Sequence, residues 1–265
     1  MRISIFNIIA FLISLFILVW GTLMVTGVAQ YEFIPAKFEF LNLPSLAIVI
    51  GGILASVFIT YPVNRVLNAF FRSLNLFSYS KIDDDMIAND IENILFWQKQ
   101  IKQDRVKAIT ELSKQYQNQF EGYLFSILDT NYTVEELREL GEIYIQETYS
   151  RQLQSNQIIT SMGKTSPVFG MLGTLFGLIV ILSSFNEMDA LLSGLATALM
   201  TTLYGIIIGN FIFTPMAKKT NNSASMQYFR ESLILEGIIL IQDQKSSLQI
   251  YDRLQAHVRT GKNSL

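Results

Sequence analysis

Four long segments of the chain are predominantly apolar, and they set the expected architecture. They cover residues 3–28, 43–63, 166–185 and 190–213, and none of them contains Asp, Glu, Lys, Arg or His. A helix of about 20 apolar residues is long enough to cross the hydrocarbon core of a bilayer. The first segment exceeds the apolar part of a typical signal peptide and lacks a clear cleavage site, so we expect it to be retained. The pattern therefore predicts four transmembrane helices.

Basic residues beside these segments predict the orientation of the chain. Lys37 is the only basic residue in the loop of residues 29–42, and the turn of residues 186–189 has none. Lys and Arg in short flanking segments stay preferentially in the cytoplasm. We therefore expect both termini, and the segment between the second and third helices, to be cytoplasmic. The basic residues on that side of a four-span topology are Arg2, Arg65, Arg72, Lys81, Lys164, Lys218 and Lys219.

The polar segment between the second and third spans, roughly a hundred residues, is large enough to be a domain. Apolar residues at spacings of three and four predict a helix over residues 81–118. Thr133 and Glu136 form the pattern of a capping box, which predicts a second helix that continues toward the third span. The expected fold is an all-α membrane protein: four transmembrane helices with a helical cytoplasmic domain inserted between helices two and three. The expected divisions are residues 1–63, 64–165, 166–214 and 215–265.

Composition narrows the range of functions. Hydrophobic residues make up 50% of the chain and charged residues 16%, which fits a membrane protein with a soluble insert. The net charge of −2 gives no basic field for a nucleic acid partner. The chain has no cysteine and a single histidine, so we expect no metal centre, no cofactor and no enzymatic activity. Gly163-Lys164-Thr165 is not a phosphate-binding loop, because Ile158 stands where that motif requires glycine.

The third and fourth spans combine small residues with hydroxyl groups. Small residues spaced three and four apart share one helix face and let two helices approach closely in lipid. Because these spans contain no Asp, Glu, Lys, Arg or His, an ion that crosses here would need its titrating group from another polypeptide. Simple helix packing, with each threonine bonded to its own helix, remains the alternative. The helix-packing residues are Gly170, Gly173, Gly177 and Gly205, and the candidate ion-pathway residues are Thr174, Thr201, Thr202 and Tyr204.

Two prolines lie at the cytoplasmic ends of the same spans. Pro167 stands near the start of the third span and Pro215 just after the fourth. Proline fixes one backbone angle and lacks an N–H group, so it often begins or ends a helix. We expect both residues to act as helix ends.

Three stretches resemble the MotA/PomA family of flagellar stator A subunits, within the MotA/TolQ/ExbB superfamily. They are SPVFGMLGTLFGL at 166–178, ATALMTTLYG at 196–205 and ILEGI at 234–238. The resemblance implies a bacterial inner-membrane motor subunit that takes part in motility. Five copies would surround two copies of a MotB/PomB-like B subunit in an A5B2 complex. The membrane helix of that B subunit carries the ion-binding Asp, and ion flow turns the rotor through its switch protein FliG.

The resemblance also assigns roles to individual positions. Thr202 corresponds to the threonine near the B-subunit Asp, and Pro167 and Pro215 correspond to two prolines linked to coupling. Thr174 occupies a position that is typically Thr in sodium-driven members and often Ala in proton-driven ones. We therefore expect transport of Na⁺, with H⁺ as the alternative.

The rotor contact is where the chain departs from the family pattern. The family has an Arg and a Glu about eight residues apart, and Lys102, Arg105 and Glu111 are the candidates that replace them here. This departure leaves two other hypotheses open. One is a TolQ/ExbB-like subunit that powers gliding, defence or outer-membrane work, although such relatives typically have three spans. The other is a purely structural anchor, which would tolerate Thr174→Val and Thr202→Val.

Overall fold

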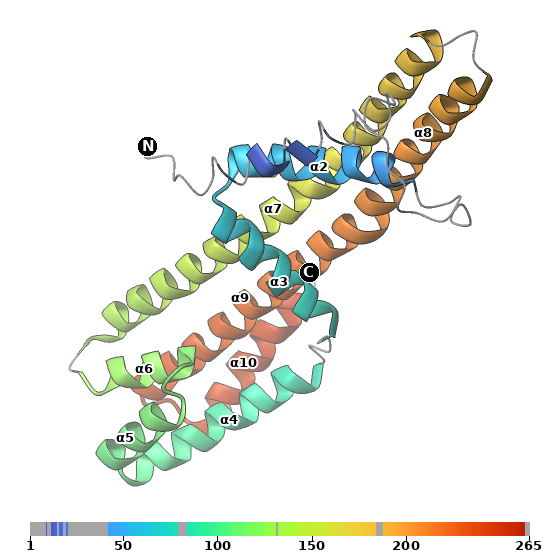
Figure 1. Cartoon of the computed structure of the whole chain (residues 1–265). Helices are drawn as coiled ribbons and strands as arrows, with labels where there is room; N and C mark the ends of the chain where they lie inside the picture. The colour runs from blue at the N-terminus through green and yellow to red at the C-terminus, as the bar shows by residue number, and fades with distance from the viewer. Residues whose placement is uncertain are drawn as a thin grey trace. The chain divides into compact units, whose positions relative to one another are not determined.

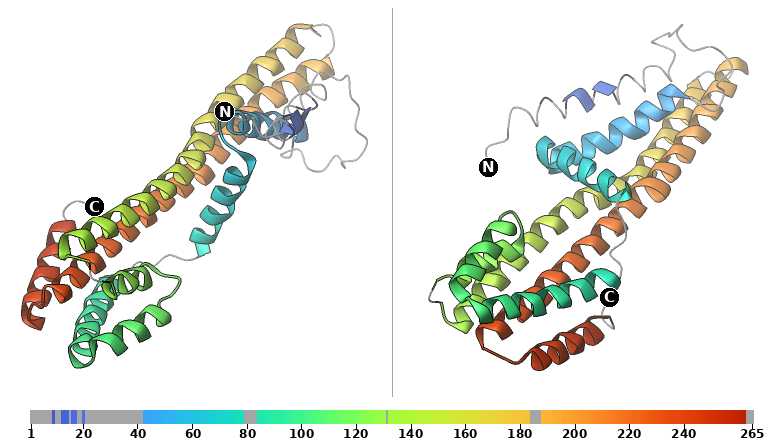
Figure 2. Two further views of the ribbon diagram at one scale, coloured as in Figure 1. Left: turned by 90° about the vertical axis from the view of Figure 1, so that its left-hand side faces the viewer. Right: turned by 90° about the horizontal axis from the view of Figure 1, so that it is seen from below.

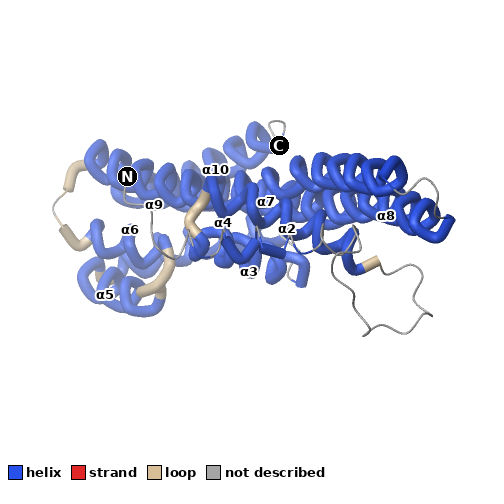
Figure 3. Tube along the Cα trace, turned by 45° about the horizontal axis from the view of Figure 1, so that its top comes forward, coloured by secondary structure: helices blue, strands red, loops and turns tan. Residues whose placement is uncertain are grey.

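The computed structural model describes residues 9, 12–14, 16–17, 20, 42–78, 84–130, 132–183 and 188–262. Every element in this part of the chain is a helix (Figure 3). Three described helical stretches, Leu43–Thr60, Val134–Ser183 and Met188–Gln242, are long and apolar enough to cross a membrane. The predicted first span lies largely outside the described residues; the residues described within it are helical.

The chain forms two compact units, one of Met1–Tyr79 with Gln154–Asn221 and one of Ser80–Leu153 with Asn222–Leu265. The first unit contains α2 (Leu43–Thr60), α3 (Val63–Ser78), α8 (Met188–Ile206) and the π-helix η1 (Ile207–Phe213). The second contains α4 (Asp84–Gln103), α5 (Arg105–Gln115), α6 (Phe120–Leu128) and α10 (Ser247–Lys262). Two long helices, α7 (Val134–Ser183) and α9 (Thr214–Gln242), contribute residues to both units.

In the first unit, α2 crosses the pair made by α7 and α8 (Figure 1). Gly52 of α2 lies against the ring of Phe169, since a Cβ atom added at Gly52 would stand 2.1 Å from the ring. A buried cluster, which includes Val57 and Val66, continues from α2 and α3 onto Met162 of α7. Pro62 lies between α2 and α3 and follows the C-cap residue of α2.

In the second unit, α4 lies beside α10 (Figure 2), and α5 packs against both α4 and α6. Trp97 and Phe125 meet edge to face, with ring centroids 5.2 Å apart, within a core of buried hydrophobic side chains. Gly237 of α9 lies against Ile94 of α4, because a Cβ atom at Gly237 would stand 2.7 Å from that side chain. The ILEGI stretch found in the sequence therefore supplies core contacts to this unit.

The structure divides the predicted helix of residues 81–118 into two helices. α4 ends at Gln103 and α5 begins at Arg105, with Asp104 between them in an extended conformation. The Asp104 side chain accepts a hydrogen bond from the Lys107 N–H at 3.2 Å and thereby caps α5. The prediction of one continuous helix was wrong because the apolar spacing continues across the break. Residues 81–83 lie outside the described part of the chain.

The capping box predicted at residues 133–136 is confirmed. The Glu136 carboxylate accepts bonds from the Thr133 N–H at 2.8 Å and from its hydroxyl at 3.0 Å, and the Glu136 N–H donates to the Thr133 hydroxyl at 3.2 Å. These bonds, the backbone one first, lower the pKa of Glu136. The helix that begins here, α7, continues toward the third span, as the sequence predicts, but it also runs through that span without interruption to Ser183.

A chain of buried and half-buried polar groups joins α7 to α9 in the second unit. Gln152 donates to Gln227 at 2.6 Å, and Gln227 donates to the Glu231 carboxylate at 2.7 Å. Burial raises the pKa of Glu231, and the nearby Glu121 raises it further, while the bond from Gln227 opposes both effects. The folded chain therefore holds a proton on Glu231 more readily than the unfolded chain does.

We expect Glu231→Gln to raise the melting temperature of the detergent-solubilised chain at pH 8, because a neutral amide accepts the same bond without the cost of a buried charge. A group with a raised folded pKa stabilises the fold below its unfolded pKa and loses that contribution as pH rises through the folded pKa. The difference between the variant and the native chain should therefore vanish below about pH 4, where Glu is protonated in both states. A melting difference that does not change with pH would contradict this account.

Candidate functional site

The second half of α7 and the whole of α8 approach each other through small residues (Figure 1). A Cβ atom added at Gly173 would stand 2.5 Å from the side chain of Thr201, and one at Gly177 would stand 2.7 Å from Ala198. At Gly170 the added atom would stand 3.0 Å from the Thr201 carbonyl oxygen. Real Cβ atoms are almost always farther from their neighbours than these three distances. A residue larger than glycine would therefore push the two backbones apart. The small-residue face predicted from spacing is therefore the face on which α7 meets α8.

Pro167 lies inside α7, so the prediction that it begins a helix was wrong. Its missing N–H leaves the carbonyl of Gly163 without the usual helical partner. A Cβ atom added at Gly209 would stand 2.9 Å from that oxygen and 3.0 Å from the Pro167 ring. Gly209 of the neighbouring helix thus leaves room for this carbonyl and for the proline ring, which a larger residue would not.

Pro215 is the second residue of α9, so it lies in the first turn of a helix, as expected of a proline at a helix end. The helical chain nevertheless continues through this boundary, because α9 follows directly on η1. In η1 the N–H of Thr214 donates to the Gly209 carbonyl five residues earlier, which gives a wider turn than an α-helix. A wide turn placed just before a proline gives the chain a way to continue past the ring with a local bend.

The three candidate threonines have different environments. Thr201 is fully buried, and its hydroxyl donates to two carbonyls of its own helix, those of Thr197 at 3.0 Å and Ala198 at 2.9 Å. Thr174 is half-buried and donates to the Met171 carbonyl at 2.6 Å. Thr202 is also half-buried, and its bond to the Ala198 carbonyl is long, at 3.5 Å. The hydroxyl of Thr202 therefore makes the longest and weakest hydrogen bond of the three.

The fourth candidate, Tyr204, belongs to a polar cluster that joins α8 to α2. Its hydroxyl accepts a bond from the Asn42 N–H at 2.9 Å. The Asn42 side chain accepts bonds from the N–H and hydroxyl of Ser45 at 3.0 and 2.9 Å. The Ser45 hydroxyl also lies 3.3 Å from the Thr197 carbonyl.

The sequence analysis missed Asn42, Ser45 and Thr197 as members of this cluster. A usable signal was present, because Asn42-Leu43-Pro44-Ser45 has the pattern of an N-cap followed by proline in the first turn. The position of Thr197 across from Ser45 depends on how α2 crosses α8, which no local pattern gives.

The described helices of the third and fourth spans offer only neutral groups to an ion. Residues 166–183 and 190–213 contain hydroxyls, backbone carbonyls and one carboxamide, Asn210, but no carboxylate or cation. Lys164, Lys218 and Lys219 lie at one end of these segments. Ion movement along this pair therefore requires a charged group from outside the described residues of the pair.

The candidate rotor-contact residues are all exposed on the second unit. Lys102 is in the last turn of α4, Arg105 is the first residue of α5, and Glu111 lies further along α5. Arg105 donates a bond to the Gln242 side chain at 2.6 Å. The break at Asp104 places the two cations on either side of a turn rather than along one helix.

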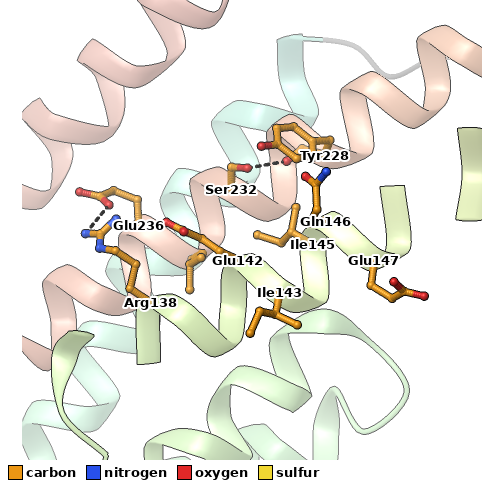
Figure 4. A pocket seen from close by; sticks show the side chains of 10 residues that line it. Arg138, Glu142, Ile143, Ile145, Gln146, Glu147, Tyr228, Ser232 and Glu236 are labelled. Atoms are coloured by element: carbon orange, nitrogen blue, oxygen red, sulfur yellow. Dashed lines mark hydrogen bonds and ion pairs between the residues drawn. The ribbon is translucent and has the colours of Figure 1, made fainter. Parts of the chain in front are cut away.

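A cavity of about 620 Å³ opens between α7 and α9 in the second unit (Figure 4). Glu236 lies at one end and is held by two arginines, Arg138 at 3.1 Å and Arg253 at 2.9 Å. Tyr228 and the exposed Ile143 are among the residues that line the remainder of the cavity. Of the charged groups that line the cavity, Glu236 is thus paired with arginines of the same chain.

The chain is similar to known membrane proteins in both sequence and fold. The model of the MotA/TolQ/ExbB proton channel family matches residues 81–230. The chain is 26% identical to the chemotaxis protein PomA of Vibrio alginolyticus, over 85% of this chain and 87% of that protein. It is 25% identical to the uncharacterized protein YtxD of Bacillus subtilis, over 93% and 87%. The structure of C. jejuni MotAB matches 93% of this chain and 95% of its own with a TM-score of 0.74 at 19% identity, which establishes a shared fold.

Proposed function

The chain belongs to the MotA/TolQ/ExbB proton channel family, a family of membrane channels and not of enzymes, and on that premise we propose that it is the A subunit of a flagellar stator. In this role it couples ion flow across the bacterial inner membrane to rotation. The proposal includes cytoplasmic termini and a cytoplasmic domain between the second and third of four spans. Similarity to PomA and to several motility A proteins over most of the chain supports it.

The observation that carries the proposal is the neutral, closely packed pair formed by α7 and α8. Gly170, Gly173 and Gly177 fix the pair through backbone contacts, and Thr202 keeps a hydroxyl with only a long bond. A pair of this kind can present oxygen atoms to an ion but cannot bind it alone, since burying an isolated ion in lipid is costly. We therefore propose a B subunit whose membrane helix supplies a carboxylate beside Thr202.

The name MotAB, given to the similar C. jejuni and Bacillus subtilis structures, supports a B-subunit partner. We extend the proposal to an A5B2 assembly that acts on the rotor protein FliG through Lys102, Arg105 and Glu111. The proposed ion is Na⁺, with Thr174 and Thr202 on its path and Pro167 and Pro215 in the coupling of ion passage to movement. The wide turn at η1, next to Pro215, is the element that could change shape as ions pass.

Swimming speed tests the proposal. A strain deleted for this gene is complemented with the native chain, Thr174→Ala or Thr174→Val, and speed is recorded across a sodium series at fixed pH. We expect deletion to leave assembled but paralysed flagella, the native chain to restore speed that rises with sodium, and Thr174→Ala to weaken that dependence. Leu175→Val, an exposed change next to Thr174, is the matched control and should leave speed unchanged.

Two outcomes would redirect the proposal. A deletion strain with no second stator set that still swims normally contradicts the flagellar role and favours a TolQ/ExbB-like motor for another machine. Full activity of both Thr174→Val and Thr202→Val would remove the ion-pathway assignment and leave these residues as packing groups.

A further inference from the structure

Helix α8 contacts a neighbouring helix on two of its sides and is open on a third. On the side of α7, Thr201 lies against Gly173. On the side of α2, the Tyr204 hydroxyl accepts a bond from the Asn42 N–H at 2.9 Å. The third side carries large apolar side chains with no cover from the described helices. Its members are Leu195, Leu199 and Ile206, which are 48%, 65% and 42% exposed.

Thr202 belongs to the open side of α8, whereas Tyr204 faces α2. Successive residues of an α-helix are about 100° apart around its axis, so side chains two positions apart point to nearly opposite sides. Thr202 follows Leu199 by three positions and precedes Ile206 by four, which places it on their side. A rotation of α8 about its own axis that moved Tyr204 relative to α2 would therefore turn the Thr202 hydroxyl by the same angle.

The polar contacts with α2 fix this rotation. Asn42 is the N-cap residue of α2, and the N–H of an N-cap residue has no partner within its own helix. The Tyr204 hydroxyl supplies that partner, and the Ser45 hydroxyl makes a longer contact of 3.3 Å with the Thr197 carbonyl. A hydrogen bond weakens steeply away from its preferred angle, so these contacts constrain the rotation of α8 more than glycine packing against α7 does.

The chain that follows α8 does not fix its rotation. The π-helix η1 begins at Ile207, three residues after Tyr204. Its wider turns interrupt the α-helical repeat, so the faces of α9 are not in register with those of α8. The direction of the Thr202 hydroxyl therefore depends on how α2 holds Tyr204.

We propose that Tyr204 is a positioning residue for ion passage: its hydroxyl, bonded to the Asn42 N–H, holds α8 at the rotation that presents Thr202 on the open side. The inference rests on the proposed role of Thr202 in the ion path. It moves Tyr204, which the sequence analysis placed among the candidate ion-pathway residues, away from the path and gives it a role that acts through Thr202.

The dependence of swimming speed on ion concentration tests the positioning role. Speed is recorded across a sodium series and a pH series for the native chain, Tyr204→Phe, Thr202→Ser and the double variant. We expect Tyr204→Phe to raise the concentration of the coupling ion at half-maximal speed several-fold, with a smaller change in maximal speed. Serine is not β-branched, so its hydroxyl reaches the same point from more than one rotation of the helix.

Thr202→Ser should therefore reduce the effect of Tyr204→Phe, a non-additivity expected of residues that act together. The matched control is Ser183→Ala, which removes a hydroxyl that donates to the Val180 carbonyl of its own helix. This variant should leave the half-maximal concentration unchanged.

Hydrogen exchange of the purified full-length chain in detergent tests the bond itself, without reference to motility. We expect Tyr204→Phe to speed exchange at least tenfold in a peptide that includes the N–H of Asn42. Exchange in α4, which belongs to the second unit, should stay the same and so show that the variant is folded.

Three results would overturn the inference. Equally slow exchange at Asn42 in both chains means that the bond does not hold α8. Faster exchange with an unchanged half-maximal concentration, or the same effect of Tyr204→Phe in the native and Thr202→Ser backgrounds, leaves Tyr204 as a packing residue. Failure of the native chain to restore swimming contradicts the stator function itself, and the positioning role falls with it; the first two results leave that function intact.

Discussion

Replacing Gly173 with valine is expected to abolish ion-driven activity and to lower the melting temperature of the detergent-solubilised chain. An added Cβ atom would lie 2.5 Å from the Thr201 side chain, and valine adds two further methyl groups. Thr201 cannot turn away without cost, because it is fully buried and bonded to two carbonyls of its own helix. Overpacking of this kind typically costs about 1–3 kcal/mol. Here the separation of α7 from α8 would also displace the hydroxyl of Thr202.

Two further variants make the prediction for Gly173 specific. Leu175→Val changes a side chain on the exposed side of the same helix and should leave both activity and melting temperature close to those of the native chain. Gly173→Ala should reduce activity and melting temperature less than Gly173→Val does. Adding Thr201→Gly to Gly173→Val should partly restore both, because substitutions of contacting residues have non-additive effects. Normal swimming of the Gly173→Val strain would show that the close approach of α7 and α8 is not required.

Replacing Asp90 with alanine is expected to destabilise the second unit by about 3 kcal/mol. Asp90 of α4 is buried and accepts two bonds from the Arg230 guanidinium of α9, at 2.6 and 2.8 Å. This carboxylate, more than any other group, raises the pKa of Arg230. Without Asp90 the guanidinium, whose side chain is only 27% exposed, would remain charged and unpaired. Thermal melting in detergent and the rate of proteolysis in α4 measure the loss.

The exposed pair Glu147 and Arg151 provides the control for Asp90. It also joins a carboxylate to a guanidinium, at 3.0 Å, but both side chains are more than half exposed. Glu147→Ala should therefore cost only about 0.3–0.5 kcal/mol. Replacing both buried partners, as in Asp90→Leu with Arg230→Met, should recover much of the stability because no charge is left unpaired. Equal effects of Asp90→Ala and Glu147→Ala would show that burial does not strengthen the Asp90 pair.

The sequence alone was sufficient for features that depend on local composition. Apolar length located the described spans, since the bilayer fixes the length of a crossing helix. The capping box at Thr133 and Glu136 located the start of α7, because its bonds join residues only three apart. The spacing of Gly170, Gly173 and Gly177 gave the contact face of the third span. The motif of residues 166–178 resembles the family to which the chain belongs.

Local patterns failed where a distant residue decided the result. The apolar spacing of residues 81–118 continues across Asp104, so the break between α4 and α5 depends on one capping side chain and on the way α5 packs with α4 and α6. The local rule that proline begins or ends a helix also failed at Pro167, which lies inside α7. Gly209, more than forty positions away, leaves space there for the Pro167 ring and for the Gly163 carbonyl.

The sequence by itself therefore determined which segments are apolar, which faces are small, and that the third and fourth spans carry no charge, because these are properties of single residues and of helical period. Tertiary structure decided which hydroxyls are already bonded. It buried Thr201 against Gly173, joined Tyr204 to Asn42, and left Thr202 with a long bond. A threonine has the same sequence signature in each of these environments, and only the approach of a second helix distinguishes them.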